Sequence, residues 1–117
     1  MNGYAVFEYA ESTATIRSAL IEVAGGQRRQ FVVCGDKGTV DIRPLEPPRL
    51  LFAPDRRRKG YEKGYQEVKL PPMPGRYDDQ LLALARIVRG QEASEYSPEH
   101  DLAVQEAVLK GSGAPLN

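Results

Sequence analysis

The chain has 117 residues, enough for one domain with a modest hydrophobic core. Its 16 basic and 16 acidic residues cancel, so bulk charge gives no attraction to nucleic acid or to an anionic membrane. No apolar run approaches the roughly 20 residues of a membrane-spanning helix, no signal-peptide pattern is visible, and a single cysteine, Cys34, excludes an internal disulfide and favours a reducing, cytoplasmic setting.

The first two thirds of the chain are typical of short β-strands separated by turns. Aromatic, β-branched and alternating patterns predict strands over Tyr4–Tyr9, Thr13–Val23, Arg28–Gly35, Thr39–Pro44, Arg49–Ala53 and Tyr65–Pro71. Gly25-Gly26 marks a turn, and the short loop Gly35–Gly38, with glycine at both ends, predicts a β-hairpin. We expect Pro44, Pro47 and Pro48 to stop the strand ladder because proline has no N–H to donate.

The last third changes to helical patterns. The segment RYDDQLLALARIVRG, residues 76–90, places apolar side chains at helical spacing, with aspartates in the first turn, arginines in the last and Gly90 as a C-terminal cap. A second helix is indicated by Ser97 at the N-cap and Pro98 at the first helical position. We expect Gly111 to end it.

Strands followed by helices predict an α+β domain: a mainly antiparallel open β-sheet with two C-terminal helices packed on one face. We expect a single domain over residues 1–117, with loose ends at 1–3 and 112–117. The predicted core between sheet and helices contains Val40, Ile42, Leu81, Leu84, Leu102 and Val108.

The second predicted strand carries apolar residues on both faces. Ile16 and Leu20 fall on one face, whereas Ala19, Ile21 and Val23 fall on the other. In a sheet with one solvent-exposed face, a strand alternates more regularly between apolar and polar residues than this strand does. The pattern therefore indicates that the face away from the helices is partly covered, by another subunit or a missing domain.

No catalytic centre can be identified from the sequence. No GxGxxG opens a helix after a strand, and the loop Gly35–Gly38 is too short for a phosphate-binding loop. His100, the single histidine, falls among acids at a helix start, where a solvated or capping role is expected. Cys34 lies in an apolar strand and is expected to be a core thiol. No set of residues is spaced to ligate a metal ion.

Four consecutive cations, Arg56 to Lys59, form the most basic stretch of the chain. They are consistent with a phosphate or nucleic-acid patch or with a solvated loop tip. Useful affinity for nucleic acid needs many phosphate contacts, so the neutral net charge favours the solvated loop tip.

A family resemblance goes further than these motifs. The stretch EYAESTATIRSALIEVAGGQRRQFVVCGDKGTVDIRPLEPP resembles the second-domain sheet of the Gfo/Idh/MocA oxidoreductases, which include glucose–fructose oxidoreductase and inositol dehydrogenase. GRYDDQLLALARIVRGQ, followed by YSPEHDLAVQEAVLKGSG, resembles the C-terminal helices of that family in order and spacing. The resemblance runs from Tyr4 to Gly113, although Gly35–Gly38 reads GDKG where the family more often has Gly-Thr-x-Gly.

The resemblance implies a domain that shapes the substrate pocket of an NAD- or NADP-dependent enzyme, acting by hydride transfer on a sugar or cyclitol hydroxyl. Its open sheet face would build a homodimer. Arg17, Ala19 and Ile21 are the implied candidates for that face. Arg76 and Tyr77 are candidates for a substrate cleft, with a core anchor as the alternative role for Tyr77.

The chain also departs from the family. It lacks the Rossmann domain, the Glu-Lys-Pro motif and the catalytic Asp…His segment. No catalytic, cofactor-binding or metal-binding residue can therefore be assigned, and the chain alone is predicted to be inactive and to bind no cofactor. The implied partners are a second copy and the missing Rossmann domain, with no nucleic acid and no membrane.

Two other hypotheses remain open. One is a free-standing module that binds a small ligand or a protein on its sheet face. The other is a nucleic-acid binder that uses Arg28, Arg29 and the cations from Arg56 to Lys59.

Overall fold

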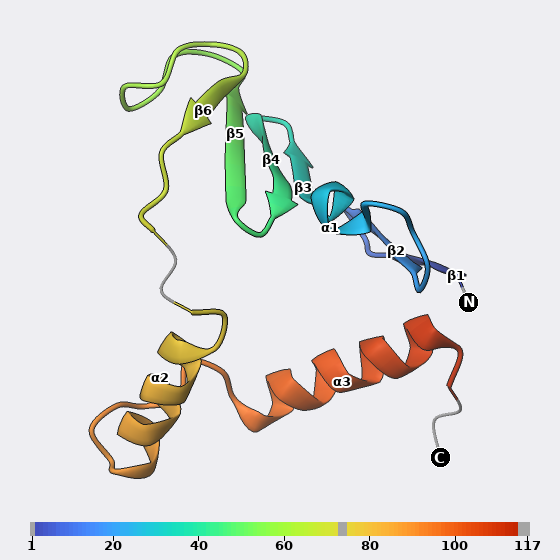
Figure 1. Cartoon of the computed structure of the whole chain (residues 1–117), viewed down its shortest axis with the longest axis vertical. Coiled ribbons are helices and arrows are strands. Elements are labelled where there is room, and N and C mark those ends of the chain that lie inside the picture. Colours follow the sequence, from blue (N-terminus) through green and yellow to red (C-terminus); the bar gives the residue numbers. More distant parts are fainter. Residues whose placement is uncertain (1, 73–74, 115–117) are drawn as a thin grey trace. The chain divides into compact units, whose positions relative to one another are not determined.

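The computed structural model describes residues 2–72 and 75–114, and the chain has the predicted α+β composition (Figure 1). The elements in chain order are β1 (Asn2–Glu8), β2 (Thr13–Ala19), α1 (Gly25–Arg28), β3 (Phe31–Gly35), β4 (Gly38–Leu45), β5 (Pro48–Pro54), β6 (Gln66–Val68), α2 (Asp78–Val88) and α3 (Pro98–Ser112). Contacts divide them into a first unit, Met1–Ile21 with Tyr77–Asn117, and a second unit, Glu22–Arg76. That the whole chain forms one domain stays a prediction.

In the first unit, β1 and β2 form an antiparallel hairpin in which Asn2 pairs with Ala19 and Glu8 with Thr13. Helix α3 packs against β1. Gly111 of α3 permits the contact, because a Cβ at this position would lie 3.0 Å from Phe7 Cζ and 3.6 Å from Ala5 Cβ. The helix therefore covers the face of the hairpin that carries the alternate residues Ala5 and Phe7.

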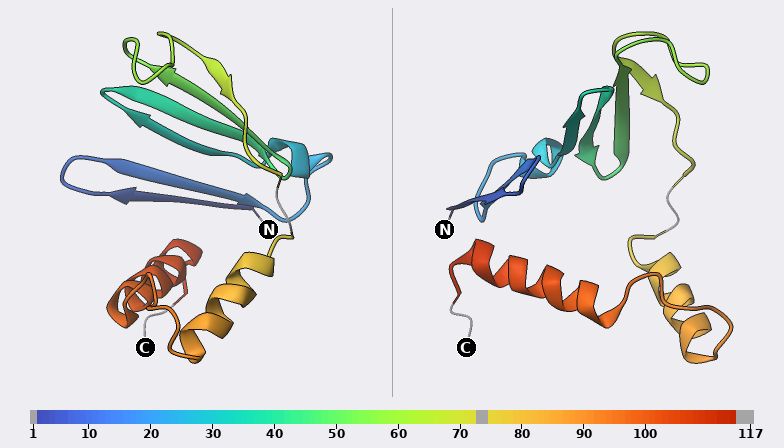
Figure 2. Two further views of the ribbon diagram at one scale, coloured as in Figure 1. Left: turned by 90° about the vertical axis from the view of Figure 1, so that its left-hand side faces the viewer. Right: turned by 180° about the vertical axis from the view of Figure 1, so that it is seen from behind.

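The two long helices end in the same way. After α2, Gly90 has φ 69° and donates its N–H to Ile87 O, while Gln91 donates to Arg86 O. This pair of bonds is the Schellman motif, which satisfies carbonyls that a helix end leaves free. Gly90 was the predicted cap, and a loop leads from it to α3 (Figure 2).

Helix α3 runs past its predicted end. Gly111 lies within the helix, and Gly113, at φ 74°, occupies the left-handed position and donates to Lys110 O at 3.1 Å. Glycine is favoured at the end of a helix, so the sequence alone allows the helix to end at Gly111 or at Gly113. In the structure Gly111 lies inside α3, where it packs on β1, and the helix ends at Gly113. Ser112 therefore belongs to α3, and Asn2 and Gly3 are paired in β1, where loose ends were expected. Residues 1 and 115–117 lie outside the described part.

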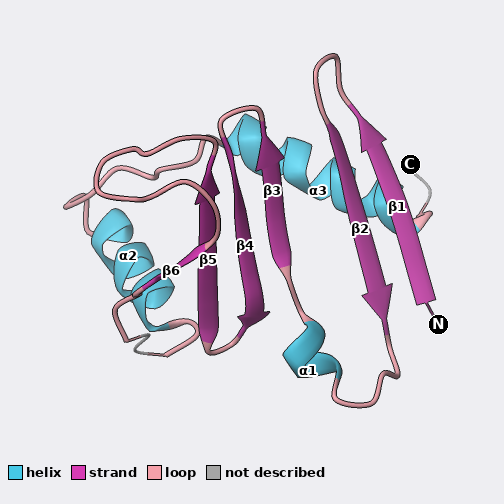
Figure 3. Ribbon diagram, turned by 90° about the horizontal axis from the view of Figure 1, so that it is seen from above, coloured by secondary structure: helices cyan, strands magenta, loops and turns pink. Residues whose placement is uncertain are grey.

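In the second unit, β3, β4, β5 and β6 form one antiparallel sheet in that order (Figure 3). The predicted hairpin is confirmed: Gly35 pairs with Gly38 across the two-residue turn Asp36-Lys37. The predicted single sheet is not found, since β1 and β2 form a separate two-stranded sheet.

The prolines modify the ladder without stopping it. Strand β4 continues through Pro44 to Leu45, and β5 begins at Pro48, with a shift in pairing register between Ile42 and Leu45. The irregular pairing accommodates Pro44, which has no N–H to donate. The prediction that the ladder ends at Pro44 is therefore wrong.

Strand β2 and its continuation also differ from expectation. Strand β2 ends at Ala19, which pairs with Asn2 of β1. The chain then turns: Gly25 donates its N–H to Glu22 O, and residues 25–28 form the short helix α1 where a turn and the start of a strand were expected. Strand β3 accordingly begins at Phe31, and β6 spans only Gln66–Val68.

The sheet and helices enclose little core within either unit. Among the described residues only Pro54 is buried, and no aliphatic or aromatic side chain is. Two of the predicted core residues, Val40 and Ile42, are half-buried in β4. The prediction of a buried core is wrong for the four helical residues, Leu81, Leu84, Leu102 and Val108, which are all exposed. Helical spacing identified their apolar stripe but not what covers it.

Candidate interaction surfaces

The hairpin of the first unit has one face turned away from α3. Tyr4 pairs with Arg17, Val6 with Thr15, and Asn2 with Ala19, so Tyr4, Val6, Arg17 and Ala19 share a face opposite to that of Ala5 and Phe7. We call these four residues the hairpin face. Tyr4 and Val6 are 69% and 51% exposed, so the hairpin face presents apolar surface to solvent.

Two of the three predicted subunit-face residues, Arg17 and Ala19, lie on the hairpin face. The third, Ile21, does not belong to a strand: β2 ends at Ala19, and Ile21 lies in the bend that follows, where it is 85% exposed. Strand alternation therefore no longer fixes its direction. The structure places Arg17 and Ala19 on the same face of β2, whereas Ile21 follows the end of the strand and is not assigned to that face.

The second unit also carries an apolar face. The pairing places seven side chains on one side of the four-stranded sheet, namely Phe31, Val33, Val40, Ile42, Leu50, Phe52 and Val68. We call this set the apolar sheet face. Phe31 and Val33 belong to the edge strand β3, in which every residue is exposed. An exposed apolar edge strand is prone to pair with another chain.

The opposite side of this sheet holds an incompletely paired carboxylate. Asp41, in β4, approaches Arg43 with one oxygen, Oδ2 to Nη2, at 3.8 Å. Its other oxygen, Oδ1, is buried without a hydrogen-bond partner among the described residues. Burying a polar oxygen without a partner costs free energy, so Oδ1 of Asp41 lowers the stability of the sheet.

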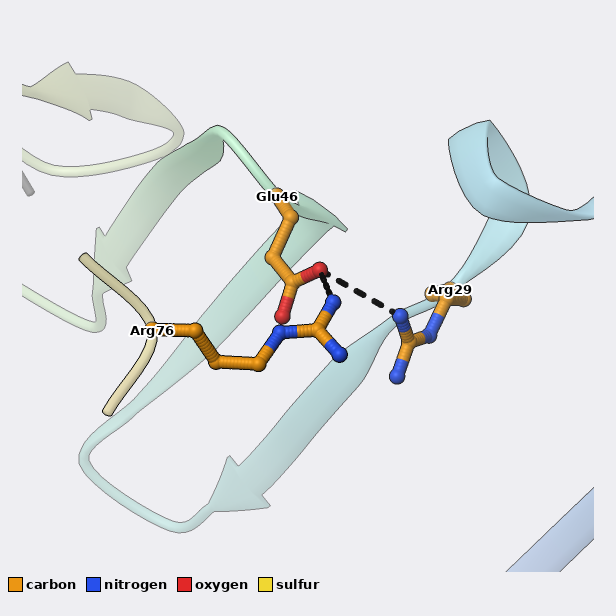
Figure 4. Close-up of polar contacts among 3 residues, drawn as sticks. All are labelled: Arg29, Glu46 and Arg76. Carbon is orange, nitrogen blue, oxygen red and sulfur yellow. Dashed lines mark hydrogen bonds and ion pairs between the residues drawn. The ribbon is translucent and has the colours of Figure 1, made fainter.

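Arg76 forms part of a small ion-pair cluster in the second unit (Figure 4). Arg76 donates from Nη2 to Glu46 Oε2, and Arg29 donates from Nη1 to the same oxygen at 3.4 Å. Glu46 lies on the turn between β4 and β5, so the cluster ties this turn to the segments that precede β3 and follow β6 in the chain. Arg76, a predicted cleft residue, is thus engaged by a carboxylate of the same unit.

Tyr77, the other predicted cleft residue, directly precedes α2 and is 58% exposed. It is the N-cap residue of α2, and its side chain accepts no hydrogen bond from the first backbone N–H groups of that helix. The alternative role as a core anchor is also unsupported by this exposure. Neither Arg76 nor Tyr77 lines the hollow described next or a smaller hollow that lies between β1 and α3.

The larger hollow lies beside the loop that joins β5 to β6. Its volume is about 600 Å³, and it is lined by Phe52, Arg56, Arg57, Arg58, Lys59 and Tyr61. We call it the loop hollow. Phe52 comes from β5, whereas the other five residues come from the loop, so the basic stretch noted in the sequence lies against aromatic side chains.

Charges in this loop are partly balanced. Arg58 contacts Asp55 at 2.9 Å, and Arg57 contacts Glu62 at 3.1 Å. The hydrogen bond from Arg58 holds the pKa of the Asp55 carboxyl below its usual value, with the charges of Arg58 and Arg56 acting in the same direction. The sequence predicted a solvated loop tip and did not reveal that Phe52 and Tyr61 would meet there.

His100 and Cys34 show no catalytic pairing. The backbone N–H of His100 donates to Ser97 Oγ at 3.2 Å, which confirms Ser97 as the N-cap, and its ring stacks on Tyr96 with centroids 4.7 Å apart. Hydrogen bonding at this helix start lowers the pKa of Glu99. Cys34 is exposed on β3, so the prediction of a core thiol is wrong. A strand can be apolar in sequence and still lie at an open edge.

No group of three or more potential metal ligands occurs in the described part of the chain, and no helix there is both long and apolar enough to cross a membrane. Comparison with known proteins gives no match to a family model, to a curated protein or to a solved structure.

Proposed function

We propose that this chain is an assembly domain, which supplies subunit contacts and pocket walls to an enzyme and performs no catalysis alone. The observation that carries the proposal is the exposed apolar surface. In neither unit is an aliphatic or aromatic side chain buried among the described residues. Large exposed apolar patches on a folded domain mark surfaces that bind other proteins.

The hairpin face is our candidate for the subunit contact. It combines the apolar side chains of Tyr4 and Val6 with Arg17 and Ala19, and α3 already covers the other face of the hairpin. Tyrosine and arginine are enriched at protein–protein contacts because each buries a large surface and keeps a polar end. The hairpin face has this composition.

A second copy of the chain is the proposed occupant. The formal net charge is zero, so two copies approach without net electrostatic repulsion. In a two-fold dimer the same patch serves both subunits, and a contact of this kind needs no second, complementary surface elsewhere on the chain.

The parent enzyme is proposed from the sequence resemblance alone. It is an NAD- or NADP-dependent oxidoreductase of the Gfo/Idh/MocA type, acting in the cytoplasm on a sugar or cyclitol hydroxyl. A Rossmann domain outside this sequence would bind the cofactor, and neither nucleic acid nor membrane would be a partner. Arg76 and Tyr77 would reach the substrate cleft only in the intact enzyme, and Arg76 would first have to leave Glu46.

A free-standing binding module is the second candidate. The apolar sheet face favours it, since Phe31 and Val33 are exposed on that face at 58% and 50%. Such a module would bind a small ligand or a protein there. A melting-temperature shift with one member of a sugar and cofactor panel would support this candidate.

The assembly proposal is tested by sedimentation velocity on two variants. Val6→Lys places a charge on the hairpin face, and Leu82→Lys places the same charge on α2 at a similar exposure, 57% against 51%. We expect Val6→Lys to dissociate a dimer and Leu82→Lys to leave it intact. Equal behaviour of the two variants would remove the hairpin face as the contact.

A further inference from the structure

We propose that the loop hollow binds a small aromatic anion, a flat ring that carries a phosphate or a carboxylate. The hollow lies in the second unit and shares no residue with the hairpin face. Its volume of about 600 Å³ falls within the range of small-molecule sites in proteins.

Four of the six residues that line the hollow are cations. Of its four cations, Arg57 is paired with Glu62 and Arg58 with Asp55. Arg56 and Lys59 form no ion pair with any residue in the described part of the chain. Lys59 and Arg56, whose charge also acts on Asp55 without an ion pair, can therefore meet an anionic group, and Arg56 offers the planar fork that fits a phosphate or a carboxylate.

The other two lining residues, Phe52 and Tyr61, are aromatic. Phe52 and Tyr61 contact one another edge to face, with ring centroids 5.3 Å apart and planes at 87°. Rings of this kind bind a further ring by stacking or edge contact. An inorganic anion would make no use of the aromatic residues, and a neutral ring would make no use of the cations. A ligand that carries both groups uses both parts.

The loop is held in place before any ligand arrives. Arg58 and Tyr61 exchange two backbone hydrogen bonds, of 2.9 and 2.8 Å, across a tight turn. Within that turn Lys59 has φ 47° and Gly60 has φ 89°. A non-glycine residue in the left-handed region is uncommon, and such residues concentrate at functional sites.

The side chain of Gln66 fixes the other arm of the loop. Its Oε1 accepts from the backbone N–H of Glu62 at 3.1 Å, and its Nε2 donates to Glu62 O at 2.6 Å. These contacts hold the backbone of Glu62, the partner of Arg57, in position.

The test uses the full chain and four probes, with binding followed by NMR titration. Phenyl phosphate and phenylacetate carry a ring and an anion, phenol carries the ring alone, and inorganic phosphate carries the anion alone. We expect at least one of the first two to bind more tightly than phenol and than phosphate. The tighter of the two identifies the anionic group.

Matched variants locate the site. The double variant Arg56→Ala/Lys59→Ala removes the two unpaired cations, whereas Lys63→Ala/Lys69→Ala removes the same charge outside the hollow. From the usual strength of exposed ion pairs, we expect the first variant to weaken phenyl phosphate binding about tenfold. We expect the second variant to weaken it less than about twofold. Tyr61→Leu should weaken phenyl phosphate and leave inorganic phosphate unchanged.

Three results would overturn the proposal. The first is equal binding of phenol and both aromatic anions, and the second is equal losses in the two double variants. The third is a single-stranded oligonucleotide that binds more tightly than phenyl phosphate and loses affinity equally in both double variants, which would indicate a diffuse nucleic-acid surface. None of these results bears on the hairpin face, so the assembly proposal is tested separately.

Discussion

Gly38, at the start of β4, is the position where the second unit should be most sensitive to a single methyl group. It pairs with Gly35 on one side and with Pro54 on the other. A Cβ at this position would lie 2.8 Å from the backbone oxygen of Ala53 and 3.2 Å from the Cα of Pro54, and its φ is 156°. Both neighbours are backbone atoms, so neither can move aside by changing a rotamer.

The free energy of unfolding of the Gly38→Ala variant follows from opposing effects. Holding alanine in a sparsely populated backbone conformation costs about 1–3 kcal/mol of backbone strain. Overpacking of the new methyl group against fixed backbone atoms costs a similar amount. The reduced entropy of the unfolded chain offsets about 0.4–1 kcal/mol. We therefore expect a net destabilisation of about 2 kcal/mol or more.

Gly35, on the facing strand of the same hairpin, provides the matched control. A Cβ there would lie 3.6 Å from Gly38 O, an ordinary contact. Gly35→Ala should accordingly be neutral or stabilise the unit by about 0.5 kcal/mol. Amide hydrogen exchange in β4 and β5 measures the difference, because it reports on the second unit alone. Equal protection in the two variants would refute the account of this hairpin.

Three further predictions concern single residues. Ser97→Ala should destabilise α3 by about 1 kcal/mol, because Ser97 Oγ accepts the His100 N–H, and Ser97→Asp should retain most of the helicity measured by circular dichroism. Cys34 should react with a thiol reagent in the native chain at close to its rate in the unfolded chain, and strong protection would contradict its exposure. The hydrogen bond from Arg58 lowers the pKa of Asp55 in the folded chain. The stability that this interaction gives the fold is therefore present above the unfolded pKa of Asp55, near 3.8, and is lost as pH falls through the lower folded pKa. An NMR titration of the carboxyl should show a midpoint below 3.8 that rises in Arg58→Gln.

Local chemistry made much of the fold predictable. The hairpin at Gly35–Gly38, the cap at Ser97 and the glycine end of α2 at Gly90 each depend on a few adjacent residues. Composition and element order were enough to predict the α+β class. These features need no knowledge of what lies across the sheet.

Features that depend on distant partners were not predictable in the same way. The pairing of Ala19 with Asn2 depends on the register between β1 and β2, and the packing of α3 at Gly111 depends on Phe7 of β1. The apolar pattern of Leu81 and Leu102 identified a face that favours burial, but no pattern within one chain identifies its cover.

The candidate surfaces were predicted in part. Alternation placed Arg17 and Ala19 on one face, and the structure confirms that they share it with Tyr4 and Val6. The loop hollow was missed, because the contact between Phe52 and Tyr61 depends on the turn at Arg58 and Tyr61, which the sequence pattern did not predict.

The most direct test of the central claim is the mass of the unmodified chain by sedimentation equilibrium across a range of concentrations. Assembly through the hairpin face predicts that the mass rises with concentration to twice the 13.0 kDa of one chain. A mass that stays at 13.0 kDa in a folded sample at every concentration would contradict the proposal that a second copy covers this face.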